Sequence, residues 1–355
     1  MKIAVIGAGN AGQALAGYMS SQGHCVSICD VNKTVIDILK EKKSIKLIGK
    51  IKTQGVIQNF AYNAADIVED ADVVFIVTTA LAHASVAAQI SSVVKDGQII
   101  VLNPGRTGGA LEFRSALEKN GCKRHYYLCE AQTIVFACRI VENGIVNIVG
   151  NKKSVAVSTL PSKDKEVILP ILQDLIPAFK SAPNVLFTSL ENYGAVFHSA
   201  ICLFNACLIE KGECFYFYKD VTPTVACFIE KLDKERVSVG KAYGVPLITA
   251  EEWLKEVYQV EGKNLYECLT TNKAYHDIIG PKDIRCRQLT EDIPTGAVPI
   301  YELGRAAGIE MPTYKALIEM ASELLNVDFF KTGRTLTRMT LENMSKNEIL
   351  AYITQ

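Results

Sequence analysis

The sequence predicts a doubly wound α/β domain with a mainly parallel sheet, followed by a second domain made of helices. Short apolar runs alternate with helical patterns through the first half of the chain, whereas the second half has long segments of helical periodicity. The chain has 355 residues, which is enough for about two domains. We place the boundary at residue 184, which gives domains of residues 1–184 and 185–355.

The composition excludes several functional classes. Thirty-eight Lys and Arg balance 38 Asp and Glu, so the chain lacks the basic excess of a general nucleic-acid binder. No run of about 18 apolar residues is free of charge, so we expect no membrane-spanning helix. The N-terminal segment continues into a glycine loop rather than a cleavage site, so we expect no signal peptide and a cytoplasmic protein.

The cysteines are predicted to be buried, reduced thiols. There are eleven of them, no two have C-x-x-C spacing, and most lie inside apolar runs. No cluster of Cys and His has the spacing of metal ligands, so we expect no metal site. Reduced thiols agree with a cytoplasmic protein.

A glycine motif near the N-terminus predicts a dinucleotide-binding turn. Residues 2–6 form a strand-like apolar run, the motif follows, and the second apolar strand closes at Asp30. Gly7 would permit a tight turn, Gly9 would let the backbone approach a pyrophosphate, and Gly12 would let helix and strand pack closely. The N-terminus of the following helix adds unpaired N–H groups and a positive dipole.

The acid at the end of the second strand favours NAD over NADP. The carboxylate of Asp30 would accept hydrogen bonds from ribose hydroxyls and repel a 2′-phosphate. Lys33 is close enough to moderate this preference, so NADP is left open. A tight turn that binds no nucleotide is the alternative interpretation. The residues expected to bind the cofactor are Gly7, Gly9, Asn10, Ala11, Gly12, Asp30 and Thr78.

Three later strands, at residues 72–79, 98–103 and 125–133, carry candidate ligand contacts at their ends. Ligands of open α/β sheets bind at the carboxyl ends of the strands. The side chains expected there are those of Thr78, Thr79, His83, Asn103, Arg106 and Thr133, of which His83, Arg106 and Thr133 are candidates for substrate binding. The alternatives are that His83 packs at a helix start and that residues 103–105 form only a turn.

A hairpin and a set of helices complete the expected fold. Asn143-Gly144 between apolar runs predicts a two-residue hairpin within residues 139–149. A short strand is expected at 185–188 and one long apolar helix at 190–212. Further helices are expected at 224–243, at 250–259 and at 300–325, the last broken by Gly308 and Pro312, and residues 280–299 are expected to be irregular.

Two residues of the second half have more than one interpretation. His198 lies in the middle of the apolar helix and is either a core histidine or a proton donor. Its position and that of His83 suit hydride chemistry better than those of the other histidines. Asp292 precedes Ile293-Pro294 and belongs either to a solvated turn or to a site.

Taken together, the motifs resemble those of the opine dehydrogenase family, which includes octopine and nopaline dehydrogenases. The resemblance runs from residue 1 to about 350 and includes the helix of His198. The matching stretches are GAGNAG at 7–12, NPGRTGGALEF at 103–113, EAQT at 130–133, RQLTEDIPTGAVP at 287–299 and GRTLTRMTLENMS at 333–345.

The resemblance implies a Rossmann-type domain followed by an α-helical domain, with the active site in the cleft between them. It implies NAD(P)H-dependent reductive condensation of an amino acid with a 2-oxo acid, often pyruvate. The family's catalytic His–Asp pair falls on His198 and Asp292, and its carboxylate-binding arginine falls on Arg287. The expected partners are these small molecules, with no nucleic acid and no membrane, and a homodimer is left open.

The chain departs from many relatives beside these residues. Gly194 and Ser199 stand where relatives often have Asn and Pro, and Gln288 stands where they often have Tyr. A different substrate is one consequence. Two other functions are kept. A 2- or 3-hydroxy acid dehydrogenase that uses no amine is one, because other dehydrogenase families share this two-domain plan. A nucleotide-binding protein without catalysis is the other, and Gly194 and Gln288 are the residues that favour it.

Overall fold

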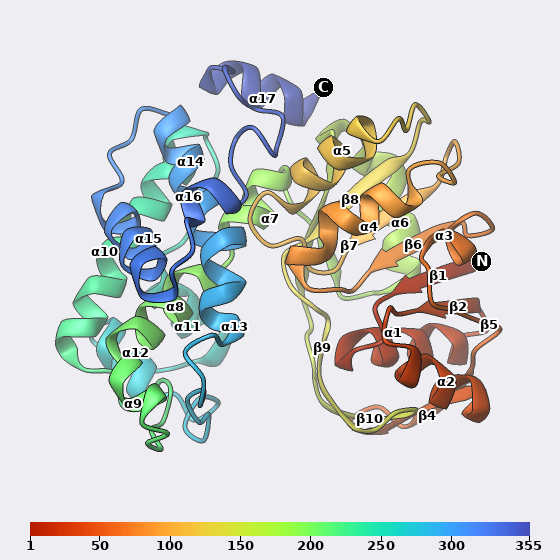
Figure 1. Ribbon diagram of the computed structural model, residues 1–355, viewed down its shortest axis with the longest axis horizontal. Coiled ribbons are helices and arrows are strands. Elements are labelled where there is room, and N and C mark those ends of the chain that lie inside the picture. The colour runs from red at the N-terminus through yellow and green to blue at the C-terminus, as the bar shows by residue number, and fades with distance from the viewer. The chain divides into compact units, whose positions relative to one another are not determined.

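The computed structural model describes residues 1–355 and divides into two compact units. The first, called the N-terminal unit here, comprises Met1–Ser189 together with Ala351–Gln355. The second, called the helical unit, comprises Leu190–Leu350. The strands all belong to the N-terminal unit (Figure 1). No helix combines the length and apolar character needed to cross a membrane.

The N-terminal unit is built on an eight-stranded sheet with the order β12-β11-β8-β7-β6-β1-β2-β5. Its strands are β1 (Lys2–Ile6), β2 (Cys25–Cys29), β5 (Asn59–Ala61), β6 (Val73–Ile76), β7 (Ile99–Leu102), β8 (Tyr127–Ala131), β11 (Val155–Leu160) and β12 (Phe179–Ser181). Six neighbouring strands of this sheet are parallel to one another, namely β5, β2, β1, β6, β7 and β8. Strand β11 pairs antiparallel with β8. This arrangement confirms the predicted Rossmann-like α/β domain.

The connections between the parallel strands are mostly helical. The helices of the N-terminal unit are α1 (Asn10–Ser21), α2 (Lys33–Lys42), α3 (Ala65–Val68), α4 (His83–Ile90), α5 (Gly109–Lys119) and α6 (Lys165–Leu175). The chain runs outward from β1 to β2 and β5 and then returns to β6 on the other side of β1. This reversal is the switch point at which open α/β sheets bind ligands.

A second sheet, which the sequence analysis predicted only in part, packs against α1. Its order is β4 (Thr53–Val56), β3 (Ser44–Gly49), β10 (Ile145–Asn151) and β9 (Phe136–Glu142). Strands β9 and β10 pair antiparallel and are joined by Asn143 and Gly144, which confirms the predicted hairpin. Strands β3 and β4 were not predicted from the sequence.

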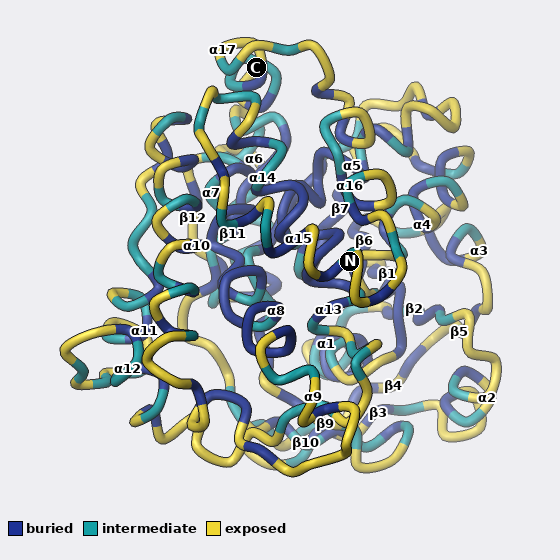
Figure 2. The backbone as a smooth tube through the Cα atoms, turned by 60° about the vertical axis from the view of Figure 1, so that its left-hand side comes forward, coloured by how far each residue is buried: buried dark blue, intermediate teal, exposed yellow.

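The helical unit surrounds the buried helix α8 (Gly194–Phe204), which Figure 2 shows largely in dark blue. The other helices are α9 (Ala206–Glu210), α10 (Pro223–Ala242), α11 (Ala250–Tyr258), α12 (Leu265–Thr271), α13 (Arg287–Thr290), α14 (Val298–Ala306), α15 (Pro312–Leu325) and α16 (Phe329–Thr332). Helix α8 contacts α10, α13 and α15. This central position agrees with its apolar sequence.

A fully buried arginine on α10 ties several segments of the helical unit together. The Arg236 guanidinium donates from Nε to Asp233 Oδ1 at 2.9 Å. It also donates to the carbonyl oxygens of Leu190 at 3.0 Å and Ile248 at 2.7 Å. Asp233 in turn accepts from the backbone N–H of Ala250 at 2.7 Å. The ion pair therefore fixes the start of α11 and the segment before α8 against α10.

Three predicted elements were wrong. Residues 185–188 belong to helix α7 (Val185–Leu190), because Asn184 Oδ1 accepts from the backbone N–H groups of Leu186 and Phe187 and so starts a helix. The single helix expected at 190–212 is divided into α8 and α9 at Asn205, whose side chain bonds back to the Ile201 carbonyl. The stretch 280–299 is helical from Arg287 onward, since α13 leads into a π-helix, Ile293–Ala297, and then α14.

Candidate active site

The glycine motif forms a tight turn whose outer face is open. Gly7 has φ +105°, and a Cβ there would lie 2.8 Å from the Val77 carbonyl oxygen. A Cβ at Gly12 would collide with the Gly7 carbonyl oxygen, because α1 packs closely against the turn. A Cβ at Gly9 would meet no atom within 4 Å. Gly7 and Gly12 are therefore required by packing, and Gly9 leaves space for a ligand.

The first backbone N–H groups of α1 fit the pyrophosphate of a dinucleotide. Gly9 is the N-cap of this twelve-residue helix and supplies no side-chain acceptor. Asp30 Oδ2 accepts from the Ala8 N–H at 2.6 Å, and Oδ1 accepts from the Asn32 N–H at 2.9 Å. Asp30 thus fixes the turn from the end of β2. The motif residues therefore offer a dinucleotide both space and unpaired donors.

The motif residue Asn10 faces the second sheet. Its Oδ1 accepts from the Ile140 N–H at 2.7 Å, which joins the start of α1 to β9. Ala11 follows it in the first turn of α1. Sequence reasoning placed both residues beside the cofactor, and the structure adds a packing role for the Asn10 side chain.

Polar side chains follow β6 and β7 at the edge where the parallel strands end. Thr78 and Thr79 come after β6, and Asn103 comes after β7. Thr78 Oγ1 and Asn103 Oδ1 are buried and have no hydrogen-bond partner within the protein. Buried polar atoms are nearly always paired, so these two mark a place for ligand donors and acceptors.

The candidate His83 lies inside the N-terminal unit. It is fully buried at the start of α4, and its ring lies 6.4 Å from that of Phe113 on α5 in an edge-to-face arrangement. This burial at a helix start agrees with the packing alternative that the sequence left open, and the role of His83 in substrate binding stays a prediction. His83 therefore lies between two helices rather than on an open surface.

Glu130, from the EAQT motif, anchors the loop that follows β7. This buried carboxylate accepts from the Ala110 N–H at 2.8 Å. Its other oxygen accepts from the hydroxyls of Thr188 at 2.6 Å and Ser189 at 2.8 Å. Ser189 Oγ also accepts from the Gly108 N–H at 2.9 Å. Sequence reasoning matched this motif without assigning Glu130 a role, which the structure shows to be positioning.

The loop held by Glu130 presents Arg106, and Thr133 lies just beyond β8. Arg106 has φ +61°, a left-handed backbone conformation that is uncommon for a residue with a side chain. Thr133 Oγ1 accepts from Lys152 Nζ at 2.7 Å. The structure thus places a lysine, which sequence reasoning missed, beside Thr133.

In the helical unit, His198 and Asp292 form a hydrogen-bonded pair although 94 residues separate them. His198 Nδ1 lies 2.7 Å from Asp292 Oδ2. The side chain of Asp292 is 4% exposed and that of His198 is 27% exposed, so the imidazole retains contact with solvent while its acidic partner does not. A buried carboxylate in this position fixes the ring orientation and stabilises the imidazolium.

The other ring nitrogen of His198 contacts Tyr218. The Tyr218 hydroxyl lies 3.0 Å from His198 Nε2, and the Tyr218 ring stacks on Tyr275 with centroids 4.2 Å apart. Burial raises the pKa of Tyr218, so the phenol remains protonated and acts as a donor. Sequence reasoning missed this contact, and only the aromatic run at residues 215–218 hinted at it.

Helix α13 holds Arg287 next to the pair. Arg287 Nε pairs with Glu291, a buried acid one turn later, while the Arg287 side chain stays 61% exposed. Ser199 Oγ on α8 donates to the Gln288 carbonyl at 2.9 Å. This bond joins the helix of His198 to the segment that carries Arg287 and Asp292. The three residues predicted for the helical unit are therefore brought together.

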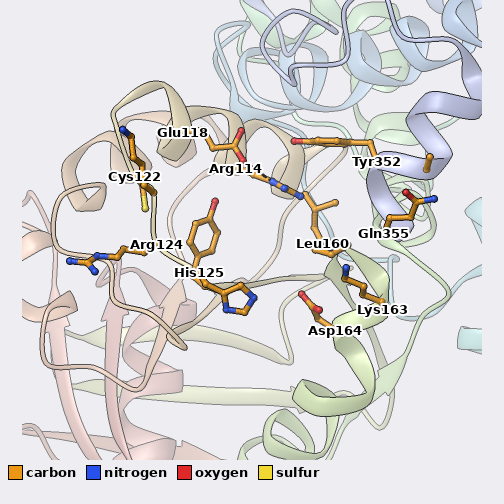
Figure 3. A pocket seen from close by; sticks show the side chains of 14 residues that line it. Arg114, Glu118, Cys122, Arg124, His125, Leu160, Lys163, Asp164, Tyr352 and Gln355 are labelled. Atoms are coloured by element: carbon orange, nitrogen blue, oxygen red, sulfur yellow. Dashed lines mark hydrogen bonds and ion pairs between the residues drawn. The ribbon is translucent and has the colours of Figure 1, made fainter.

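An unrelated cavity of about 620 Å³ lies at the opposite edge of the main sheet. It is lined by the segment 122–126, which precedes β8, and by the end of β11. Figure 3 shows Tyr352 from the C-terminal residues beside Arg114 of α5, and the guanidinium lies 4.8 Å from the ring centroid. Because dinucleotides bind at the carboxyl ends of parallel strands, this cavity is separate from the candidate site.

Comparison with known proteins identifies the family. Residues 181–325 match the α-helical domain of NAD/NADP octopine/nopaline dehydrogenases, and residues 2–107 match the N-terminus of NAD-dependent glycerol-3-phosphate dehydrogenases. The chain is 36% identical to opine dehydrogenase of Arthrobacter sp. (strain 1C) over 344 residues, which are 96% of each chain. The chain belongs to the opine dehydrogenase family. It is an NAD(P)-dependent oxidoreductase, as predicted.

More distant relatives agree with this assignment. Octopine dehydrogenase of Pecten maximus is 28% identical over 295 residues, 75% of this chain and 73% of that one. A structure of octopine dehydrogenase with NADH and agmatine has a TM-score of 0.83 at 25% identity and covers 99% of this chain and 98% of its own. NADP⁺-bound yersinopine dehydrogenase shares the fold, with a TM-score of 0.75 at 15% identity, over 99% of this chain and 97% of its own.

Proposed function

We propose that this opine dehydrogenase joins the amino group of an amino acid to a 2-oxo acid such as pyruvate by reductive condensation. The observation that carries the proposal is the hydrogen-bonded pair of His198 and Asp292, with Arg287 on the adjoining helix. A proton carrier and a carboxylate binder are the two groups that an amino acid and an oxo acid require. Family membership supplies the reaction class.

His198 is proposed to carry the proton at Nε2. Its Nδ1–H donates to Asp292, which fixes the tautomer and leaves Nε2 for exchange. In the free protein the Tyr218 hydroxyl donates a hydrogen bond to Nε2. This hydrogen bond must break when Nε2 accepts a proton from a substrate. An amine and an oxo acid lose water to give an imine, and reduction of that imine consumes one hydride and one proton. His198 can take the proton that the ammonium group of the amino acid loses before condensation, hold it at Nε2 and return it when the imine is reduced.

Arg287 is proposed to pair with a substrate carboxylate. Its planar guanidinium can present two parallel N–H groups, whereas a lysine would act as a point charge. Glu291 holds Nε of the arginine, so the terminal nitrogens remain to meet the substrate. The ion pair with Glu291 thereby orients Arg287 and leaves part of its guanidinium available.

The turn of residues 7–12, Asp30 and Thr78 are proposed to hold the dinucleotide, with NAD preferred because Asp30 repels a 2′-phosphate. When bound, the cofactor supplies the hydride that reduces the carbon–nitrogen double bond. Lys33 begins α2 three residues after Asp30, so its charge keeps NADP use open. Its Nζ lies 5.9 Å from the Tyr62 ring centroid. The proposed role of Asp30 predicts tighter binding of NADH than of NADPH.

The decisive experiment follows NADH oxidation with pyruvate, with and without a pool of the common amino acids. Oxidation that requires both substrates is the expected result, and testing the amino acids singly then names the amine. Oxidation with pyruvate alone would identify a hydroxy acid dehydrogenase instead. NADH binding without turnover on a wide panel of oxo acids and amines would identify a nucleotide-binding protein.

A further inference from the structure

Lys152 lies at the edge of the main sheet where the parallel strands end. It follows β10, and its backbone N–H donates to the Val135 carbonyl at 3.1 Å, which holds it beside the segment that leaves β8. Its Nζ donates to Thr133 Oγ1 at 2.7 Å. The ammonium group is therefore fixed next to a residue already predicted to contact substrate.

This edge position corresponds to the substrate end of the cofactor site. In a Rossmann-type domain one half of the sheet serves the adenosine and the other half serves the nicotinamide. Asp30, after β2, marks the adenosine half. Thr133 follows β8, three strands beyond β1 in the other direction. Lys152 thus belongs to the half in which the reacting carbon of a substrate must lie.

The charge on Lys152 is poorly compensated in the free protein. It takes part in no salt bridge, and its hydrogen-bond partner is a neutral hydroxyl. The side chain is exposed, yet partial desolvation together with the charge of Arg106 lowers the pKa of Lys152 to about 8. A bound anion would relieve both effects.

Thr133 adds a second donor directed at the same place. Because its oxygen already accepts from Lys152, its own hydrogen is available for a ligand. The lysine keeps two further N–H groups. An anion here would meet one hydroxyl donor and one ammonium, with the Arg106 guanidinium close by. A carboxylate has the size and charge for such a set of donors.

We propose that Lys152 binds the carboxylate of the 2-oxo acid, together with Thr133 and Arg106. The inference rests on the proposed function, because it takes the oxo acid to be the anion at this edge. Lys152 acts in binding and takes no part in proton transfer, which belongs to His198. The carboxylate of the amino acid is then left for Arg287.

The inference is tested directly by measuring the Kd of pyruvate for the protein–NADH complex. NADH fluorescence gives the signal, and no amino acid is present. Lys152→Met is expected to raise the Kd of pyruvate roughly 10- to 100-fold, as for the loss of a charge-assisted hydrogen bond. The Kd of NADH should not change. Lys152→Arg should restore most of the affinity. Lys153→Met removes the neighbouring exposed charge and is expected to behave as wild type.

The pH dependence separates a charge effect from a structural one. Lys152 carries its charge below a pKa of about 8 and loses it above, so the Kd of pyruvate should rise with pH through that range in the wild type. Lys152→Arg should show no such rise, and Lys152→Met should bind weakly at every pH. Equal affinities in Lys152→Met and Lys153→Met would overturn the inference while leaving amine-dependent turnover intact. Absence of amine-dependent turnover in the wild type would overturn the proposed function itself.

Discussion

At the scale of single residues, the pair of His198 and Asp292 gives the strongest prediction about catalysis. His198→Ala is expected to lower kcat by roughly 10²–10⁴, the usual contribution of a positioned acid–base group. The Kd of NADH should remain close to that of the wild type, because the dinucleotide residues lie in the N-terminal unit. Steady-state kinetics and NADH fluorescence measure the two effects separately.

A second histidine of the same unit provides the control. His276 also pairs with an acid, Asp277, at 3.0 Å, but both side chains are exposed. His276→Ala is expected to leave kcat unchanged. If His198→Ala retains full activity, the catalytic assignment is wrong.

The glycines of the turn predict two different defects. Gly9→Ala adds a methyl group where nothing lies within 4 Å, so the protein should fold normally and bind NADH more weakly. Gly12→Ala places a methyl group against the Gly7 carbonyl oxygen, so its main effect should be a lower melting temperature. Thermal unfolding and an NADH titration of both variants check this. Equal NADH affinity in Gly9→Ala and the wild type would contradict the role of the open face.

Residue patterns predicted only some of the site. The glycine motif and Asp30 are local signals, so sequence alone was enough to predict a role for them. His198 and Asp292 are far apart in the chain, and their pairing followed from family resemblance rather than from spacing. Tyr218 and Lys152 escaped prediction because their contacts depend on how distant segments fold together, and neither lies in a recognisable motif.

At the scale of elements, α10 depends on its buried arginine. Arg236→Met leaves Asp233 as an unpaired buried charge and removes donors from two carbonyl groups, so it should destabilise the helical unit by about 3–5 kcal/mol. Denaturant unfolding measures the loss. Lys234→Met, an exposed change on the same helix, is expected to have little effect. A stability equal to wild type in Arg236→Met would refute this account of the helical core.

Errors in predicting elements came from side chains that bond to the backbone. Residues 185–188 have the composition of a strand, yet the Asn184 side chain captures two N–H groups and begins a helix. Asn205 ends α8 in a segment whose apolar pattern continues beyond it. Apolar periodicity indicates which face is buried, but these caps decide where a helix begins and ends.

At the scale of the whole molecule, the C-terminal residues belong to the unit that begins the chain. Tyr352→Ala removes the ring that covers Arg114 and should destabilise the N-terminal unit by about 1–3 kcal/mol, through lost burial and a lost cation–π contact. Tyr352→Phe is the matched control, since the hydroxyl is buried without a partner and its removal should cost little. Thermal unfolding reports stability. A parallel NADH titration should show normal affinity in both variants, and weakened NADH binding would contradict the separation of the two sites.

The order of the two domains was predictable, because strand–helix alternation and helical periodicity are properties of continuous segments. The second sheet was not, since it pairs β3 with β10 across about a hundred residues of sequence. The packing of residues 351–355 on the N-terminal unit was equally unpredictable, because the sequence of a short terminal helix does not indicate which surface the helix contacts.

The packing of the C-terminal residues on the N-terminal unit also determines the order in which contacts form during protein synthesis. The ribosome releases the N-terminus first, and domains generally fold as they emerge. The main sheet and the dinucleotide turn can form while the helical unit is still being translated, but the aromatic cover of Arg114 is made only after the last codons are read. Until then the nascent N-terminal unit exposes the surface of α5 that Tyr352 later covers, and a chain that stops a few residues early keeps that surface exposed.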